Sequence, residues 1–149
     1  GFWCYLYRAI DRDGNLLDSM LSEHRDRESA RRFLRRLIDG QDQKPLRLTT
    51  DKHPAYTKAI RRIVGRKVQH RQNQYLNNRM EQHHRPIKQR YYPMLGFNRF
   101  ESASRFCTAF DELRQYLRVP NSSVQRASAS DKRHIFSRRW SSLMTELAA

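Results

Sequence analysis

The sequence has few of the features that define membrane or disulfide-stabilised proteins. No apolar run approaches the ~20 residues that a helix needs to cross a bilayer, so we do not expect this chain to be an integral membrane protein. No N-terminal secretion signal is visible. The only cysteines, Cys4 and Cys107, lie far apart and form no CxxC unit. This excludes a cysteine-based zinc module and a disulfide scaffold, and it suits a reducing cytoplasm.

Acidic residues are also scarce. The 149 residues include 15 Asp and Glu against 30 Lys and Arg, which gives a net charge of +15. Such an excess favours a polyanionic partner, with nucleic acid first and an anionic membrane surface second. The simpler alternative is a solvated basic surface. No P-loop, GxGxxG or GxSxG motif is present to indicate a nucleotide-binding or serine-hydrolase site.

The distribution of charge favours nucleic acid. Residues 52–100 contain a single acid, Glu81, among twelve basic residues: Lys52, Lys58, Arg61, Arg62, Arg66, Lys67, Arg71, Arg79, Arg85, Lys88, Arg90 and Arg99. Four tyrosines, Tyr56, Tyr75, Tyr91 and Tyr92, are interleaved with them. Basic groups beside aromatic rings suit DNA or RNA better than lipid, because they meet both phosphates and exposed bases.

Hydrophobic periodicity predicts alternating strands and helices. The first part of the chain indicates a strand over 2–10, a hairpin turn at Asp13-Gly14, a returning strand over 16–21 and a helix over 27–38 capped by Asp26. Further on we expect a strand over 46–50, a helix containing residues 55–63 and a strand over 68–71. This order indicates a mixed α/β fold.

The remaining elements are predicted to be helical. Asn77 or Asn78 is expected to cap a helix that carries Glu81 and is kinked or shortened by Pro86. Asn98 and Glu101 have the spacing of a capping box before the next helix. We expect a linker over 119–130 and a last helix over 131–147 within a C-terminal segment 131–149.

Two carboxylates in the basic region are candidate metal ligands. Asp51 ends a predicted strand, and Glu81 shares a helix face with Lys88, seven residues later. Carboxylates in such a surrounding are suited to hold Mg²⁺ for phosphoryl transfer, where Lys88 would contact a phosphate. The alternative is that Glu81 pairs with Arg85 and that Asp51 caps the following helix.

The histidines and Cys107 are weaker candidates. His83 and His84 are adjacent and therefore point to different sides of a helix. They form a zinc site with His53 and His70 only if the fold gathers all four, which their spacing does not require. We interpret them as surface residues. Cys107 lies near an apolar helix face and is interpreted as a core residue.

Three segments resemble a known family. They are YLYRAIDRDGN (5–15), LTTDKHPAY (48–56) and RQNQYLNNRMEQHHRPIKQRYYPMLGF (71–97). Together they resemble the catalytic core of bacterial insertion-sequence transposases in the family named after insertion sequence six, over residues 1–118. The resemblance implies a ribonuclease H-like mixed sheet flanked by helices, followed by C-terminal helices. It also implies a bacterial cytoplasmic protein associated with the nucleoid.

The resemblance assigns roles to individual residues. In that family three acids bind two metal ions, Mg²⁺ or Mn²⁺, and drive cleavage and joining of DNA strands. Asp51 matches the second acid and Glu81 the third. Lys88 matches a basic residue that contacts DNA near the cut, and the further DNA-contact candidates are Lys52, Arg79, Arg85 and Arg90. The implied partners are double-stranded DNA, as transposon ends and target, and further copies of the chain.

One departure from the family pattern affects the expected activity. The family's first acid lies on a strand that would precede Gly1, and Asp11, Asp13 and Asp18 do not occupy its place. We therefore expect little activity from this chain alone, and an uncovered sheet edge that invites pairing with another chain. The alternatives are a non-catalytic DNA-binding or regulatory fragment and a decayed gene product.

Overall fold

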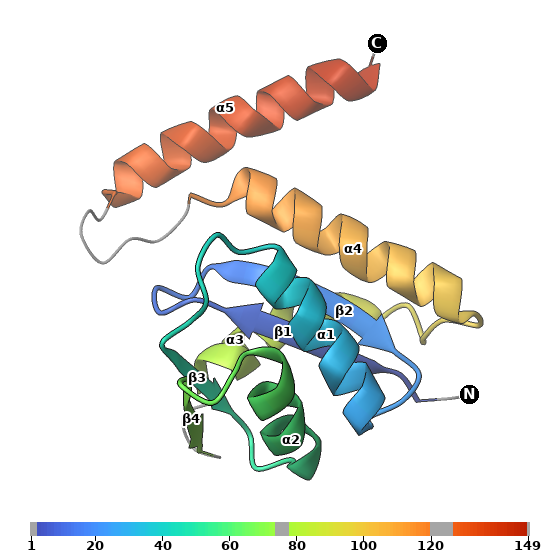
Figure 1. The fold of residues 1–149 in the computed structure, drawn as a ribbon. Helices are drawn as coiled ribbons and strands as arrows, with labels where there is room; N and C mark the ends of the chain where they lie inside the picture. The colour runs from blue at the N-terminus through green and yellow to red at the C-terminus, as the bar shows by residue number, and fades with distance from the viewer. Residues whose placement is uncertain (1–2, 74–77, 120–126, 149) are drawn as a thin grey trace.

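The computed structural model describes residues 3–73, 78–119 and 127–148, with only the backbone of residues 78 and 79 (Figure 1). These ranges contain four strands and five helices mixed along the chain, which confirms the prediction of an α/β fold. The described elements are β1 (Tyr5–Ile10), β2 (Leu16–Ser22), α1 (Arg27–Asp39), β3 (Arg47–Thr50), α2 (Pro54–Ile63), β4 (Gln69–Gln72), α3 (Asn78–Tyr91), α4 (Phe100–Leu117) and α5 (Ala129–Ala148).

The chain opens with an antiparallel hairpin. Strands β1 and β2 pair with Tyr5 opposite Ser22, and the turn between them places Gly14 at φ +84°. The Asp11 carboxylate closes this turn by accepting hydrogen bonds from the backbone N–H and the side-chain amide of Asn15. The positive φ explains the glycine, because other residues rarely adopt that region. The predicted hairpin is confirmed.

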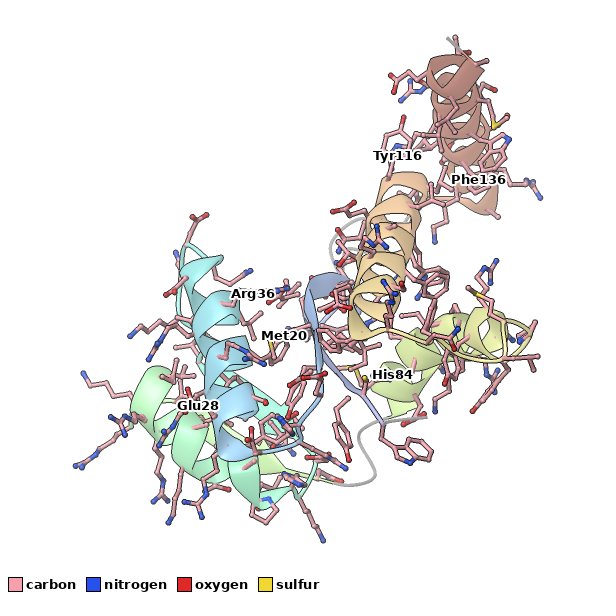
Figure 2. All side chains as sticks on the ribbon, turned by 90° about the vertical axis from the view of Figure 1, so that its right-hand side faces the viewer. Met20, Glu28, Arg36, His84, Tyr116 and Phe136 are labelled. Atoms are coloured by element: carbon pink, nitrogen blue, oxygen red, sulfur yellow. The ribbon has the colours of Figure 1, made fainter. Side chains whose placement is uncertain are left out.

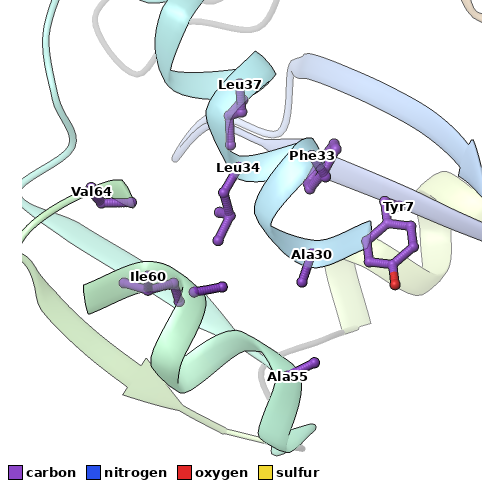
Figure 3. Packing of buried hydrophobic residues seen from close by; sticks show 9 residues of the cluster. Tyr7, Ala30, Phe33, Leu34, Leu37, Ala55, Ile60 and Val64 are labelled. Atoms are coloured by element: carbon purple, nitrogen blue, oxygen red, sulfur yellow. The ribbon is translucent and has the colours of Figure 1, made fainter. Parts of the chain in front are cut away.

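The apolar core lies between the hairpin and the first two helices. Helix α1 begins at the predicted cap, where the Asp26 carboxylate accepts the N–H of Ser29 at 2.8 Å. Its apolar face meets α2 in one cluster (Figure 3), which consists of Tyr7, Ala30, Phe33, Leu34, Leu37, Ala55, Ala59, Ile60 and Val64. This cluster holds α2, and thereby the end of β3 that leads into it.

The strands do not form one continuous sheet in the described residues. Strand β3 pairs in parallel with β4, with Arg47 opposite Gln69, and this pair is separate from the β1–β2 hairpin. The expected single mixed sheet is therefore replaced by two two-stranded sheets. Each strand then has one edge with no partner strand in its own sheet, because only two strands pair in each. The uncovered edge implied by the family resemblance stays a prediction. The ribonuclease H-like fold stays a prediction.

The helices form layers on both sides of the hairpin. Figure 2 shows α1 and α2 on one side of it and α3 and α4 on the other. Helix α5 diverges from α4 (Figure 1) and contacts its C-terminal end, where Arg139 donates to the carbonyl of Tyr116 at 2.7 Å. No side chain of α5 is buried. Among the described residues, no helix is long and apolar enough to cross a membrane.

Three details of the predicted boundaries are wrong. Helix α4 begins after Arg99, which makes no side-chain cap, so Asn98 does not form a capping box. Helix α3 continues past Pro86 to Tyr91, so Pro86 does not shorten it, whereas the alternative of a kink at Pro86 stays a prediction. Helix α5 starts at Ala129 instead of Asp131, because Ser128 and Asp131 cap its first turn reciprocally. The predicted cap Asn77 and most of the linker, 120–126, lie outside the described residues.

Candidate functional site

Asp51 directly follows β3, at the strand end where α/β proteins commonly place functional groups. Its Oδ2 accepts a hydrogen bond from Nη2 of Arg25 at 2.9 Å, and its Oδ1 accepts the backbone N–H of His53 at 3.1 Å. The side chain is 33% exposed. Asp51 is thus accessible, but both oxygens already have a donor.

The start of α2 fixes the backbone around Asp51. His53 is the cap residue of α2, and its Nδ1 accepts the N–H of Ala55 at 3.4 Å. Pro54 occupies the first helical position, where the missing N–H costs nothing. The cap of α2 is therefore His53, so the alternative that Asp51 caps this helix is wrong; Asp51 accepts only the backbone N–H of the cap residue.

Glu81 lies in the first turn of α3, and 68% of its side chain is exposed. Its Oε2 lies 3.7 Å from Nζ of Lys88, two turns along the same helix face. The sequence prediction that these two side chains share a face is confirmed. Glu81 pairs with Lys88 and not with Arg85, the partner that the alternative interpretation predicted.

The pairing of Asp51 with Glu81 in one metal site stays a prediction. In the described parts of the chain they share no hydrogen-bond or ion-pair partner. The same ranges contain no group of three or more His, Cys, Asp or Glu residues arranged to hold a metal ion. The donor chemistry of the two carboxylates fits a hard divalent cation, because carboxylate oxygens are its preferred ligands and Mg²⁺ commonly takes only one or two of them from a protein.

The histidines are dispersed and do not form a zinc site. His53 caps α2, and Nε2 of His70 lies 2.8 Å from the Thr50 hydroxyl. His83 is only 7% exposed, so its interpretation as a surface residue is wrong. It belongs to the inner face of α3 with Ile87, four residues later, and that apolar spacing was the signal for its burial. Burial also lowers the pKa of His83.

The surroundings of the half-buried His84 strongly favour its neutral form. Burial, assisted by the positive charge of Arg8, lowers the pKa of His84 from 6.5 to about 4. Cys107, in contrast, is buried as predicted for a core residue, and burial raises the pKa of its thiol to about 11. Such a thiol is a poor nucleophile at neutral pH.

A buried ion pair next to α3 was not predicted from the sequence. The guanidinium of Arg8, on β1, pairs with the Asp111 carboxylate of α4 and also donates to the carbonyl of His83. The Arg8 side chain is fully buried. Strand alternation points Tyr7 into the apolar core and Arg8 to the opposite side, and only the packing of α4 shows which acid meets it.

The predicted DNA contacts are mostly exposed. Lys52, Arg85, Lys88 and Arg90 lie at the surface, whereas the side chain of Arg79 is outside the described residues. Lys52 adjoins Asp51 at the end of β3, and the guanidinium of Arg90 lies 5.6 Å from the centre of the Phe110 ring. Arg85, Lys88 and Arg90 follow Glu81 on α3, and the sequence has no acid between residues 82 and 100.

Comparison with known proteins identifies the family. A family model described as a DDE domain matches residues 1–119. The chain belongs to the DDE-domain family of insertion-sequence transposases. Both Asp51 and Glu81 fall within the part of the DDE domain that is matched.

The curated relatives of this DDE domain include transposases. The chain is 45% identical over 94 residues to the transposase for insertion sequence-like element IS431mec of Staphylococcus aureus, and likewise to that of IS257 in transposon Tn4003. These alignments cover 60% of this chain and 42% of each relative. An uncharacterized Yersinia pseudotuberculosis protein is 39% identical over 66 residues, 43% of this chain and 62% of that protein. No solved structure matches.

Proposed function

We propose that this DDE domain acts on DNA in transposition, as part of a catalytic core that cleaves and joins strands at transposon ends. The observation that carries the proposal is the DDE-domain match over residues 1–119, which includes the strand-end Asp51 and the helical Glu81. The +15 net charge supports a DNA substrate, because neutralised phosphates release their counterions on binding.

Asp51 and Glu81 are the proposed metal ligands, and Mg²⁺ or Mn²⁺ the proposed ion. When bound, such an ion activates an attacking oxygen and stabilises the leaving oxygen of a phosphodiester. In the described arrangement Arg25 neutralises Asp51 and Lys88 neutralises Glu81. Both cations therefore have to give way to the metal, and both remain close enough to contact phosphate oxygens afterwards.

Exposed cations of α3 supply the proposed DNA-contact surface, joined by Lys52 beside Asp51. We assign Lys88, Arg85 and Arg90 to phosphate contacts, with Arg79 as a further candidate from the sequence. We assign the main phosphate contact to Lys88, because its ammonium group lies 3.7 Å from the carboxylate of Glu81, a proposed metal ligand. We also propose that the working form contains more than one copy of the chain.

Two observations support a second candidate function, in which the protein binds DNA without cleaving it. The described residues gather no three-ligand metal group, and Asp51 is tied to Arg25. A DNA-binding or regulatory protein without cleavage activity needs only the cationic surface. The two functions differ in their dependence on divalent metal, which one experiment measures directly.

The experiment measures Mn²⁺ binding and nicking of supercoiled DNA by the full chain and its variants. We expect Asp51→Asn and Glu81→Gln each to weaken Mn²⁺ binding and to abolish metal-dependent nicking. The matched controls are Asp42→Asn and Glu101→Gln, which change exposed acids of the same type elsewhere. Asp42 lies in the loop before β3, whereas Asp51 directly follows that strand.

The outcomes separate the two functions. Nicking that requires Mn²⁺ and is lost only in the Asp51 and Glu81 variants supports the enzyme. Salt-sensitive DNA binding without nicking, and with Mn²⁺ affinity equal in all four variants, supports the non-catalytic function. A chain that binds neither metal nor DNA contradicts both.

A further inference from the structure

The segment after α3 exposes an apolar tip in a cationic surrounding. Leu95 is 96% exposed, and its neighbours Tyr92 and Met94 are also exposed. Arg90 and Arg99 flank this tip, and the sequence from 82 to 100 has no acidic residue. A soluble protein normally covers such a group of side chains, so its exposure requires an explanation.

The backbone holds Leu95 in a conformation that costs free energy. Its φ of +57° is in the left-handed region, which leucine rarely adopts because Cβ approaches the carbonyl oxygen. Two turn hydrogen bonds impose this conformation, from Met94 N–H to the Tyr91 carbonyl at 3.2 Å and from Leu95 N–H to the Tyr92 carbonyl at 3.1 Å. Non-glycine residues in such conformations cluster at functional sites.

The turn rests on a packed aromatic base. Tyr91 lies 5.9 Å from Phe97 between ring centres, and Phe97 lies 5.2 Å from Phe106 of α4. The Tyr91 hydroxyl also closes the space beside Gly96, where an added Cβ would be 3.3 Å away. Leu95 is therefore a projecting apolar side chain on a fixed support.

We propose that Leu95 is a wedge that inserts between two stacked bases of bound DNA, while the adjacent cations hold the phosphates. This inference rests on the proposed function, because it takes DNA as the partner. Charge complementarity favours DNA over a second copy of this chain, since two such cationic surfaces repel one another. Leucine, methionine and proline side chains are used as wedges that unstack and kink duplex DNA.

The test compares Leu95→Asn with Leu46→Asn in the full chain. Asparagine tolerates the left-handed conformation, so Leu95→Asn removes the apolar wedge while relieving backbone strain, and its Tm should equal or exceed that of the wild type. Leu46 is 89% exposed in the loop before β3 and provides the same chemical change away from the turn.

The probes are duplexes carrying 2-aminopurine, with or without a neighbouring mismatch, in EDTA so that no cleavage occurs. We expect the wild type and Leu46→Asn to raise 2-aminopurine fluorescence severalfold and to prefer the mismatched duplex by about tenfold, because a mismatch lowers the cost of unstacking. Leu95→Asn should bind paired duplex with the same salt dependence, lack the fluorescence rise and lose the preference.

Three results would overturn the wedge. One is DNA binding by the wild type, seen as fluorescence anisotropy, without any rise in 2-aminopurine emission. Another is an unchanged rise in Leu95→Asn. The third is a dimer, measured by light scattering, that Leu95→Asn converts to monomer, because Leu95 then contacts a second copy. If the wild type does not bind DNA, the proposed function itself is contradicted. Fluorescence anisotropy detects this case directly, so it is distinguished from the three results that contradict only the wedge.

Discussion

The two sides of the β1–β2 hairpin are held by different forces. On one side, apolar side chains of α1 and α2 close over Tyr7 in a dense cluster. On the other side, the adjacent Arg8 pairs with Asp111 and donates to the His83 carbonyl. This polar side also contains a cavity of about 310 Å³, lined by residues that include Arg8, His83, Asp111 and Arg114.

The stability of the two sides therefore depends on different interactions. The stabilisation from apolar burial requires no charged group, whereas a buried ion pair stabilises only while both partners remain charged. Glu81 projects from α3, the helix that covers the polar side (Figure 2), and Asp51 follows a strand attached to the apolar side through α2. The two proposed metal ligands are therefore held by different kinds of packing.

The largest effect should come from breaking the buried pair. We expect Asp111→Ala to lower the free energy of unfolding by about 3–5 kcal/mol, because it leaves the Arg8 charge buried without its partner. Urea denaturation followed by circular dichroism measures this change. The double variant Arg8→Met, Asp111→Leu should recover most of the loss. A single variant that costs less than about 1 kcal/mol would contradict the assigned role of the pair.

The apolar side should be nearly as sensitive. Leu34 is one of the largest fully buried side chains, so Leu34→Ala should cost about 2–5 kcal/mol through lost contacts and the resulting cavity. The exposed Leu46→Ala control should change the free energy of unfolding by no more than about 0.5 kcal/mol. Equal costs at the two positions, measured in urea, would refute the dense packing described for this cluster.

Acid should weaken the polar side specifically. The pKa of His84 is about 4 in the folded protein against an ordinary 6.5, so the unfolded chain binds more protons between these values. Stability from neutral His84 is thus fully present above pH 6.5 and is lost as pH falls toward 4. After discounting for partial exposure, we expect a loss of about 1–2 kcal/mol.

The comparison of His84→Gln with wild type isolates this effect from other acid-sensitive groups. The variant should lose less stability between pH 7 and pH 4.5, measured in urea at each pH. Charged groups near His84 are Arg8 from β1 and Glu81, His83 and Lys88 from α3. His134→Gln, on the exposed α5, is the control and should retain the wild-type pH dependence. Parallel stability profiles for all three proteins would rule out the burial argument.

The smallest effect on stability should accompany a change in metal affinity. Arg25→Gln removes an exposed ion pair and should cost less than about 1 kcal/mol. It should also tighten Mn²⁺ binding, because Asp51 then has no competing cation. Arg36→Gln, which removes the exposed pair with Asp18, is the matched control and should leave Mn²⁺ affinity unchanged. If calorimetric titration finds equal Mn²⁺ affinities for Arg25→Gln and the wild type, Asp51 is not a metal ligand.

Local sequence signals predicted most of the elements of this fold. Asp26 and the apolar spacing after it predicted α1, and Asp13-Gly14 predicted the hairpin, because capping and turn chemistry act over a few residues. The prediction failed at Asn98, where Arg99 starts α4 without a side-chain cap. The metal roles of Asp51 and Glu81 stay predictions, although the structure confirms that Glu81 and Lys88 meet.

By itself, the sequence determined the order of strands and helices, the cationic region and the helix face shared by Glu81 and Lys88. These properties depend on neighbouring residues and on helical repeat, which act over short separations. Only the tertiary structure decided that Arg8 meets Asp111, that His83 is buried and that the strands form two separate pairs. Such contacts join segments far apart in the chain, and the packing of whole elements selects them.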